Sequence, residues 1–281
     1  MNMTHRVTET SIERFRQHLL QEEKSKATIH KYVQELCFLS RFAKGRRLNK
    51  KLLLDYRSFL MEQYLPQTVN GKLSAINAYL HCMKLEQYCL RYLRISRKLF
   101  LSEQKELSLP EYERLLKCAK TWKNKRMYYV LLTLGASGIR VSELRFITME
   151  ALEQGYVQIH SKGKIRCIVL SHALICSLQE YCLQRSIRKG MIFCTRNGKE
   201  LDRSNICHDM KLLFQQAEVS PAKVFPHNFR HLFARRFYEI EHNLAHLADV
   251  LGHSSIETTR IYVSASIRCH ERILDQMDLV R

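Results

Sequence analysis

The chain has 281 residues, of which 46% are hydrophobic, and it carries a formal net charge of +19. The apolar share is enough for a packed core and excludes a disordered chain, and the length allows one large domain or two of ordinary size. The excess of 46 Lys and Arg over 27 Asp and Glu predicts a polyanionic partner, with nucleic acid favoured over an anionic membrane surface.

The absence of certain sequence patterns excludes several other classes of protein. No apolar run reaches the roughly 18–20 residues of a membrane span, and the N-terminal segment lacks the apolar core of a secretory signal. No GxxxxGK[ST] loop is present, so we expect neither nucleotide binding nor nucleotide hydrolysis. The ten cysteines form no CxxC pair, which favours reduced thiols packed inside a cytoplasmic protein over disulfides or metal ligands.

The first hundred residues show the apolar period of four amphipathic helices joined by basic connections, one of which is the loop Lys44–Lys51. Ser25 is a candidate cap before the second helix, and Gly45 follows that helix. A solvated bundle would satisfy this pattern, and so would a bundle whose charged side lies on phosphates. The apolar positions of the four helices are Ile12, Phe15 and Leu19; Ile29, Tyr32, Val33, Leu36 and Leu39; Leu53, Tyr56 and Leu60; and Val69, Leu73, Ile76, Leu80 and Met83.

A basic stretch without a clear period follows and predicts an extended linker. A new helix is predicted where Ser108 and Glu111 form a capping box, with Pro110 in the first turn. We therefore divide the chain into a helical domain of residues 1–95, a linker of residues 96–105 and a second domain of residues 106–281.

The fold class predicted for the whole chain is mainly α with a small β-sheet. Two β-like runs around a short connection that contains glycine predict a hairpin in the second domain. The expected elements of this domain are a helix over about 127–136 that stops near Gly138, a short helix over 140–147, strands at Tyr156–His160 and Ile165–Leu170, a third strand at Met191–Thr195, and helices from Arg203 onward.

Five stretches of the second domain hold polar side chains in apolar surroundings. Guanidinium forks match phosphate oxygens, imidazoles exchange protons near neutrality, a lysine can reach a leaving oxygen, and a tyrosine can act as a covalent nucleophile. Such a set predicts attack on a phosphodiester in which fixed cations replace a divalent ion, so we expect no metal and no cofactor. The residues are Arg140 and Glu143, Lys162 and Lys164, His227 and Arg230, His253, and Tyr262.

Each of these residues has a simpler interpretation when taken alone. Arg140 would be a surface ion-pair partner of Glu143, the two lysines would be solvated at a turn, and Tyr262 would be a core or interface tyrosine. Two histidine pairs have the i, i+4 spacing of zinc ligands, but asparagine stands where the zincin pattern needs glutamate. These pairs are His227 with His231 and His242 with His246.

In order and spacing, the polar stretches resemble the tyrosine recombinases, also called the phage integrase family. The resemblance covers nearly the whole chain and is carried by SGIRVSEL (Ser137–Leu144), PHNFRH (Pro226–His231) and LGHSSIETTRIYV (Leu251–Val263). It implies an N-terminal helical core-binding (SAM-like) domain followed by an α+β catalytic domain. Because no arm-binding module precedes these domains, the chain is more similar to Xer-type or mobile-element recombinases than to long bivalent phage integrases.

The resemblance also implies a role for each residue of the set. The covalent link formed by the tyrosine would conserve the bond energy, so no ATP site would be needed. By this resemblance Arg140 and Arg230 clamp the scissile phosphate, His227 and His253 act as proton acceptor and phosphate hydrogen-bond donor, Lys162 protonates the departing 5′-hydroxyl, Tyr262 forms a 3′-phosphotyrosyl link, and Glu143 orients its neighbours.

The hairpin connection departs from the family's pattern, which reads Gly-Lys-Gly, then a residue or two, then a basic residue and an arginine. Here Ser161 stands in the first glycine position, and the turn is one residue shorter. We assign the general acid to Lys162 because it precedes Gly163, and Lys164 remains the alternative.

Two features near the C-terminus bear on assembly of the site. His253 is predicted just outside the start of a helix and Tyr262 near its end, with their backbones about 12–14 Å apart. They would meet at one phosphate if both side chains point inward or if the tyrosine helix is displaced. The tail Glu271–Val280 has one apolar face, which would pack on its own domain or, as the resemblance implies, on a neighbouring protomer. That face holds Ile273, Met277 and Val280.

Together these inferences predict a site-specific DNA recombinase whose two domains form a C-clamp around duplex DNA. The resemblance implies a homotetramer on two duplexes with exchanged tails, in the bacterial cytoplasm and associated with the nucleoid. Two alternatives remain at this point: a catalytically silent DNA-binding regulator, and a relaxing enzyme like the type IB topoisomerases.

Overall fold

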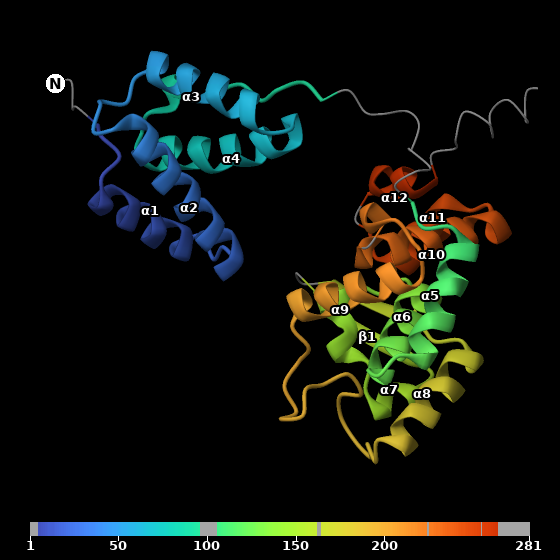
Figure 1. Ribbon diagram of the computed structural model, residues 1–281. Helices are drawn as coiled ribbons and strands as arrows, with labels where there is room; N and C mark the ends of the chain where they lie inside the picture. The colour runs from blue at the N-terminus through green and yellow to red at the C-terminus, as the bar shows by residue number, and fades with distance from the viewer. Residues whose placement is uncertain (1–4, 96–105, 162–163, 224, 254, 264–281) are drawn as a thin grey trace, which may run out of the picture. The chain divides into compact units, whose positions relative to one another are not determined.

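The chain folds into two compact units, Met1–Arg97 and Lys98–Arg281, each with its own hydrophobic core (Figure 1). They are called the N-terminal unit and the C-terminal unit below. The computed structural model describes residues 5–95, 106–161, 164–223, 225–253 and 255–263.

The N-terminal unit is a bundle of helices, as the apolar period predicts. Ser25 caps the second helix by accepting a hydrogen bond from the amide of Thr28, and Lys44 ends that helix in the left-handed conformation. The predicted apolar faces form the core, since Phe15, Leu36 and other such positions are fully buried. The elements are α1 (Glu9–Gln21), α2 (Lys26–Ala43), α3 (Lys50–Gln63), α4 (Pro66–Cys82) and the short 3-10 helix η1 (Glu86–Tyr88).

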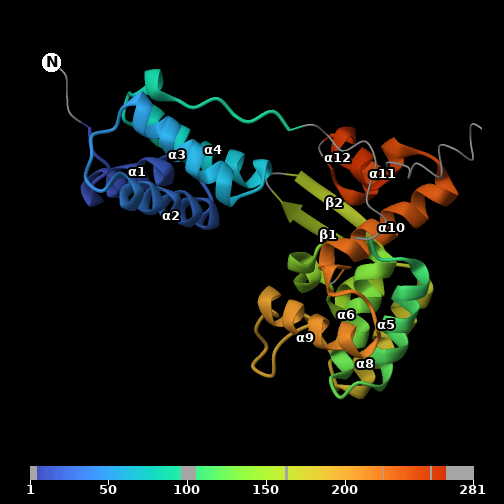
Figure 2. The ribbon, with the colours of Figure 1, turned by 45° about the horizontal axis from the view of Figure 1, so that its top comes forward.

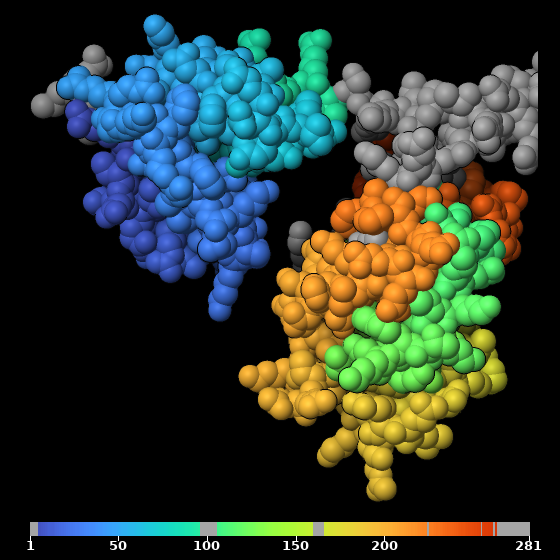
Figure 3. Space-filling view, viewed as in Figure 1, coloured from blue at the N-terminus to red at the C-terminus, as the bar shows by residue number. Residues whose placement is uncertain are grey.

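The C-terminal unit is mainly helical and contains one small sheet, which confirms the predicted fold class. Its first helix begins with the predicted capping box of Ser108 and Glu111. Although far apart in the sequence, α5 and α9 lie side by side in this unit (Figure 3). Its elements are α5 (Leu109–Thr121), α6 (Lys125–Ser137), η3 (Val141–Phe146), α7 (Met149–Gln154), β1 (Tyr156–Ser161), β2 (Lys164–Val169), α8 (His172–Gln184), α9 (Arg203–Gln216), η4 (Pro221–Lys223), α10 (Pro226–Glu241), α11 (Leu244–Leu251) and α12 (Ile256–Val263).

The two strands form the predicted antiparallel hairpin, with Tyr156 opposite Val169 and Ser161 opposite Lys164 (Figure 2). Alternate side chains such as Val157 and Ile159 point into the core, as expected for a strand with one buried face. Strand β2 also packs against α11, so the hairpin and the C-terminal helices share one region of the unit.

The predicted third strand at residues 191–195 is wrong. This segment makes only isolated bridges, from Met191 to Thr148 and from Cys194 to Glu200, and does not join the sheet. The amide of Ile192 donates to the carbonyl of Ile147, in the loop before α7. The apolar run at residues 191–195 therefore reflects a buried segment and not a strand. A strand also needs a neighbouring strand with a free edge to pair with.

The cysteines and the lengths of the helices bear on the disulfide and membrane-span expectations. All nine cysteines in the described ranges are free thiols. A membrane-crossing helix would need more apolar length than any helix in these same ranges possesses.

Candidate active site

Six of the predicted residues meet where the ends of α6, α10, α11 and α12 come together, and two residues that were not predicted, one from the hairpin and one from α10, join them. Glycine ends both α6 and α11 in the left-handed conformation, at Gly138 and Gly252, so that the chain turns sharply at the site. A Cβ atom on Gly138 would overlap the ring of Phe233 on α10, which shows how closely α6 and α10 approach. The side chains brought together are Arg140, Glu143, Arg166, His227, Arg230, His231, His253 and Tyr262.

Arg230 is the centre of the cluster and is only 2% exposed. Its Nη1 donates to the carbonyl of Gly138 at 2.7 Å, and its Nη2 donates to the carbonyl of Leu251 at 2.5 Å. Both carbonyls lie at helix C-termini, where carbonyl groups lack partners within the helix and the helix dipole is negative. Burial, together with the nearby charge of Arg140, lowers the pKa of Arg230 to about 10, so its guanidinium stays protonated at neutral pH.

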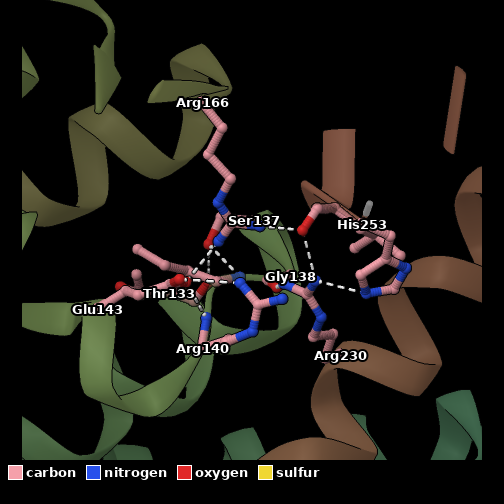
Figure 4. Close-up of polar contacts among 10 residues, drawn as sticks. Thr133, Ser137, Gly138, Arg140, Glu143, Arg166, Arg230 and His253 are labelled. Atoms are coloured by element: carbon pink, nitrogen blue, oxygen red, sulfur yellow. Dashed lines mark hydrogen bonds and ion pairs between the residues drawn. The ribbon is translucent and has the colours of Figure 1, made fainter. Parts of the chain in front are cut away.

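Arg140 is the more accessible of the two predicted arginines, with a side chain that is 41% exposed. Its Nη1 donates to Oε1 of Glu143 at 2.9 Å, and its backbone amide donates to Oε2 at 2.8 Å. The carboxylate of Glu143 is almost fully buried and also accepts a hydrogen bond from Arg166 of β2. Figure 4 shows these groups in one connected set with Arg230 and His253.

His253 is held in one protonation state by its two partners. Its Nε2 lies 3.0 Å from Nη2 of Arg230, and its Nδ1 lies 2.8 Å from the hydroxyl of the buried Thr259. Since arginine can only donate, Nε2 is the acceptor and Nδ1 carries the proton. Burial and the nearby Arg230 lower the pKa of His253 to about 4, which agrees with a neutral ring. In this structure His253 therefore accepts a hydrogen bond from Arg230 through Nε2.

Tyr262 is 4% exposed and is enclosed by three histidine rings. Its ring is stacked on His253 with centroids 5.4 Å apart, and its centroid lies 4.4 Å from that of His231. Its hydroxyl lies 3.3 Å from Nε2 of His227. Side chains therefore bridge the distance that the helix sets between the backbones of His253 and Tyr262.

Two residues of this cluster were not among the sequence-predicted site residues. Arg166 ends the stretch SKGKIR, and the family's hairpin pattern, which closes on an arginine, was the signal that could have identified it. His231 was considered only as a zinc-spaced partner of His227, although the same i, i+4 spacing places both rings on one helix face. Nδ1 of His231 is buried and has no hydrogen-bond partner among the described residues.

The hairpin lysines are less fully described. Lys162 and Gly163 lie outside the described residues. Lys164 is described through its backbone, which pairs with Ser161 at the start of β2.

The histidine pairs with zinc-like spacing have other contacts. His227 and His231 pack against Tyr262, while His246 lies 3.0 Å from Glu241. In the described ranges no three His, Cys, Asp or Glu side chains converge as a metal site requires.

The neutral histidines predict that acid destabilises the C-terminal unit. Burial and the nearby His227 lower the pKa of His231 to about 4, below its usual 6.5. Between these two pH values, His231 is protonated in the unfolded chain but not in the folded chain. The free energy of unfolding therefore falls as the pH drops through this range. We expect the wild-type protein to have a lower unfolding temperature at about pH 5 than at about pH 7.5. The difference between the two unfolding temperatures should be smaller for His231→Gln.

The single tryptophan makes this measurable, because Trp122 packs on the core of the C-terminal unit and its fluorescence reports that unit alone. His208→Gln, which removes an exposed histidine from α9, is the matched control. An equal drop in unfolding temperature for the wild type and His231→Gln would contradict the prediction for His231.

Known proteins provide an independent comparison. The model of the phage integrase family matches residues 105–267. The tyrosine recombinase XerD of Vibrio cholerae is 32% identical over 225 residues, which cover 75% of this chain and 74% of that protein. The tyrosine recombinase XerA of Pyrococcus furiosus is 26% identical over 277 residues, which cover 96% and 94%.

Among solved structures, the Tn1549 transposon integrase in complex with transposon right end DNA is similar with a TM-score of 0.72. The two proteins are 16% identical, and the match covers 96% of this chain and 99% of that one. This likeness shows a shared fold. The family match spans more than half of the chain and includes every residue of the cluster. The chain therefore belongs to the phage integrase family, the tyrosine recombinases.

Proposed function

We infer that this chain is a site-specific DNA recombinase that cuts and rejoins duplex DNA through a 3′-phosphotyrosyl intermediate. The observation that carries this proposal is the placement of the Tyr262 hydroxyl beside His227, in the pocket that also holds Arg230 and His253. A phenol needs both a proton acceptor and nearby cations to attack phosphorus at neutral pH, and this pocket offers both.

In the proposed reaction the oxygen of Tyr262 attacks the scissile phosphorus while its proton passes to Nε2 of His227. The bond from phosphorus to the 5′-oxygen breaks, and Lys162 gives that oxygen a proton. A 5′-hydroxyl then attacks the phosphotyrosyl bond and regenerates the tyrosine. One phosphoester replaces another at each step, so the cycle needs no nucleotide hydrolysis.

The two arginines are proposed to stabilise the negative charge that gathers on the phosphate in the transition state. Arg230 is buried and immobilised by two backbone carbonyls, which makes it a preorganised cation. Its Nε has no hydrogen-bond partner among the described residues, so this donor remains for a ligand. Arg140 approaches from the exposed side.

Double-stranded DNA is the partner that this chemistry requires. Lys and Arg outnumber Asp and Glu in both units, so both are proposed to contact one duplex as a C-clamp, with residues 1–95 as the core-binding domain and residues 106–281 as the catalytic domain. The Tn1549 integrase, which shares the fold, was solved with transposon DNA.

The assembly is proposed to be a homotetramer in which C-terminal tails are exchanged. The tail with Ile273, Met277 and Val280 lies outside the described residues. An apolar groove of about 240 Å³ between α5, α6 and α10 would receive an apolar helix face. Its lining includes Leu109, Tyr112, Leu232, Phe233 and Phe237.

The choice of general acid predicts a leaving-group effect. Lys162→Ala is expected to slow cleavage, and a substrate with a better leaving group at the 5′-position should recover the rate because it needs no proton. The measurement is the rate of covalent adduct formation on the two substrates. Lys164→Ala is the matched control, and recovery seen only in that variant would transfer the role to Lys164.

The test of the proposed function starts from the covalent adduct. Protein trapped on DNA should yield one recurring sequence when the attached DNA is sequenced, and two copies of that sequence should undergo strand exchange. Relaxation of a supercoiled plasmid without such a site would favour a topoisomerase-like enzyme instead. Specific binding without an adduct on any nicked DNA would favour a regulator, although every position of the expected polar set is filled.

A further inference from the structure

The carboxylate of Glu143 is shared by two arginines. Arg140 donates to it from Nη1 and from its backbone amide, and Arg166 donates to the same Oε2 that the amide uses. The remaining nitrogens of the Arg140 guanidinium have no hydrogen-bond partner among the described residues. Oε2 of Glu143 thus already accepts two hydrogen bonds, and the carboxylate holds only one end of the Arg140 fork.

The carbonyl of Leu251 is shared in a similar way. Arg166 donates to it from Nη1, and Arg230 donates to it from Nη2. Arg166 therefore spans from the carboxylate that holds Arg140 to the carbonyl that holds Arg230. It is nearly buried, with a side chain that is 11% exposed, so these contacts are formed away from bulk solvent.

The local backbone accommodates Arg166 closely. Gly252 follows Leu251 with φ +64°, and a Cβ atom there would overlap the Arg166 side chain. A glycine at this position therefore both ends α11 and admits the guanidinium to the Leu251 carbonyl.

We infer that Arg166 is a positioning residue for strand cleavage, which fixes the separation between Arg140 and Arg230 and keeps part of the Arg140 fork available for the scissile phosphate. This inference rests on the proposed function. Without Arg166, Oε2 of Glu143 would be open to a second contact from Arg140, because arginine and carboxylate favour two parallel hydrogen bonds. Arg140 would then be withdrawn towards Glu143, and the Leu251 carbonyl would hold Arg230 alone.

The experiment measures single-turnover adduct formation on a nicked duplex that carries the sequence recovered from the wild-type adduct. Arg166→Ala is expected to lower the rate by about 10- to 100-fold, because a displacement of a reacting group by about 1 Å can cost about 100-fold in rate. DNA affinity should be unchanged. Arg166→Lys should recover only part of the rate, since one ammonium cannot replace a planar fork that has two partners. Arg145→Ala removes an exposed arginine of η3 that pairs with Glu200, and serves as the matched control.

A second substrate distinguishes a positioning role of Arg166 from a loss of folding in the Arg166→Ala variant. In a methylphosphonate at the scissile position one charged oxygen is replaced by a methyl group, so the demand on Arg140 is smaller. If Arg166 acts through the phosphate clamp, the difference between the wild type and Arg166→Ala should shrink to a few-fold on this substrate. An equal loss on both substrates, with a lower unfolding temperature by Trp122 fluorescence, would overturn the inference. Absence of any adduct with the wild-type protein would instead overturn the proposed function itself.

Discussion

Tyr262→Phe is expected to abolish the covalent protein–DNA adduct while leaving DNA binding intact. The substitution removes only the hydroxyl, which lies 3.3 Å from His227, and it keeps the ring that packs between His231 and His253. The lost hydrogen bond is worth about 1 kcal/mol, so the unit should remain folded. Without the nucleophile no phosphotyrosyl bond can form. The measurement is adduct formation on a nicked duplex, followed by denaturing electrophoresis.

Tyr238→Phe provides the control, because Tyr238 is a partly buried tyrosine of α10 that packs on the same small cluster. It should form adduct at the wild-type rate. Persistence of the adduct in Tyr262→Phe would remove this residue from the nucleophilic role.

Arg230→Ala is expected to have the second large effect, on both catalysis and stability. The lost cation should slow adduct formation by about 10²- to 10³-fold, the usual cost of removing one preorganised donor from a site where negative charge develops. The substitution also leaves the carbonyl of Gly138 without its donor, at about 1–3 kcal/mol, whereas the carbonyl of Leu251 keeps the hydrogen bond from Arg166. Fluorescence of Trp122 should therefore report a lower unfolding temperature, in parallel with the rate measurement.

Arg145→Ala is the matched control for this substitution. It removes an arginine from the same unit, but one that is half exposed and pairs with Glu200. Its adduct formation should match the wild type. A normal cleavage rate in Arg230→Ala would mean that the phosphate is held elsewhere.

Mixing Tyr262→Phe with Arg230→Ala tests which protomer supplies the tyrosine. Tyr262 already lies against His227 of its own chain, so the nucleophile and the arginine clamp should act within one protomer. A mixture of Tyr262→Phe and Arg230→Ala should then form adduct no faster than Arg230→Ala alone. Clearly faster adduct formation in the mixture would show that the tyrosine is donated to a neighbour.

The helices and the hairpin could be predicted because their signals are local. The apolar period of α1 to α4 and the capping box of Ser108 and Glu111 depend on neighbours three or four residues apart. The prediction of a strand at residues 191–195 was wrong for the opposite reason. An apolar run marks burial, and only the rest of the fold decides whether a partner strand is at hand.

The contacts of the cluster lay beyond any sequence pattern. Arg166 and Leu251 are 85 residues apart in the chain, and Arg230 and Gly138 are 92 residues apart. No period or spacing reports such a pairing, so the part played by Arg166 and the enclosure of Tyr262 by His231 were not foreseen.

The sequence alone determined which chemical groups the protein carries, because residue types, their order and the helix that separates His253 from Tyr262 are covalent or local properties. The tertiary structure alone decided where those groups meet and in which state. The packing of α10, α11 and α12 against one another buries His231 and His253 and holds their pKa values low, since desolvation and neighbouring charge depend on what the folded chain brings into contact.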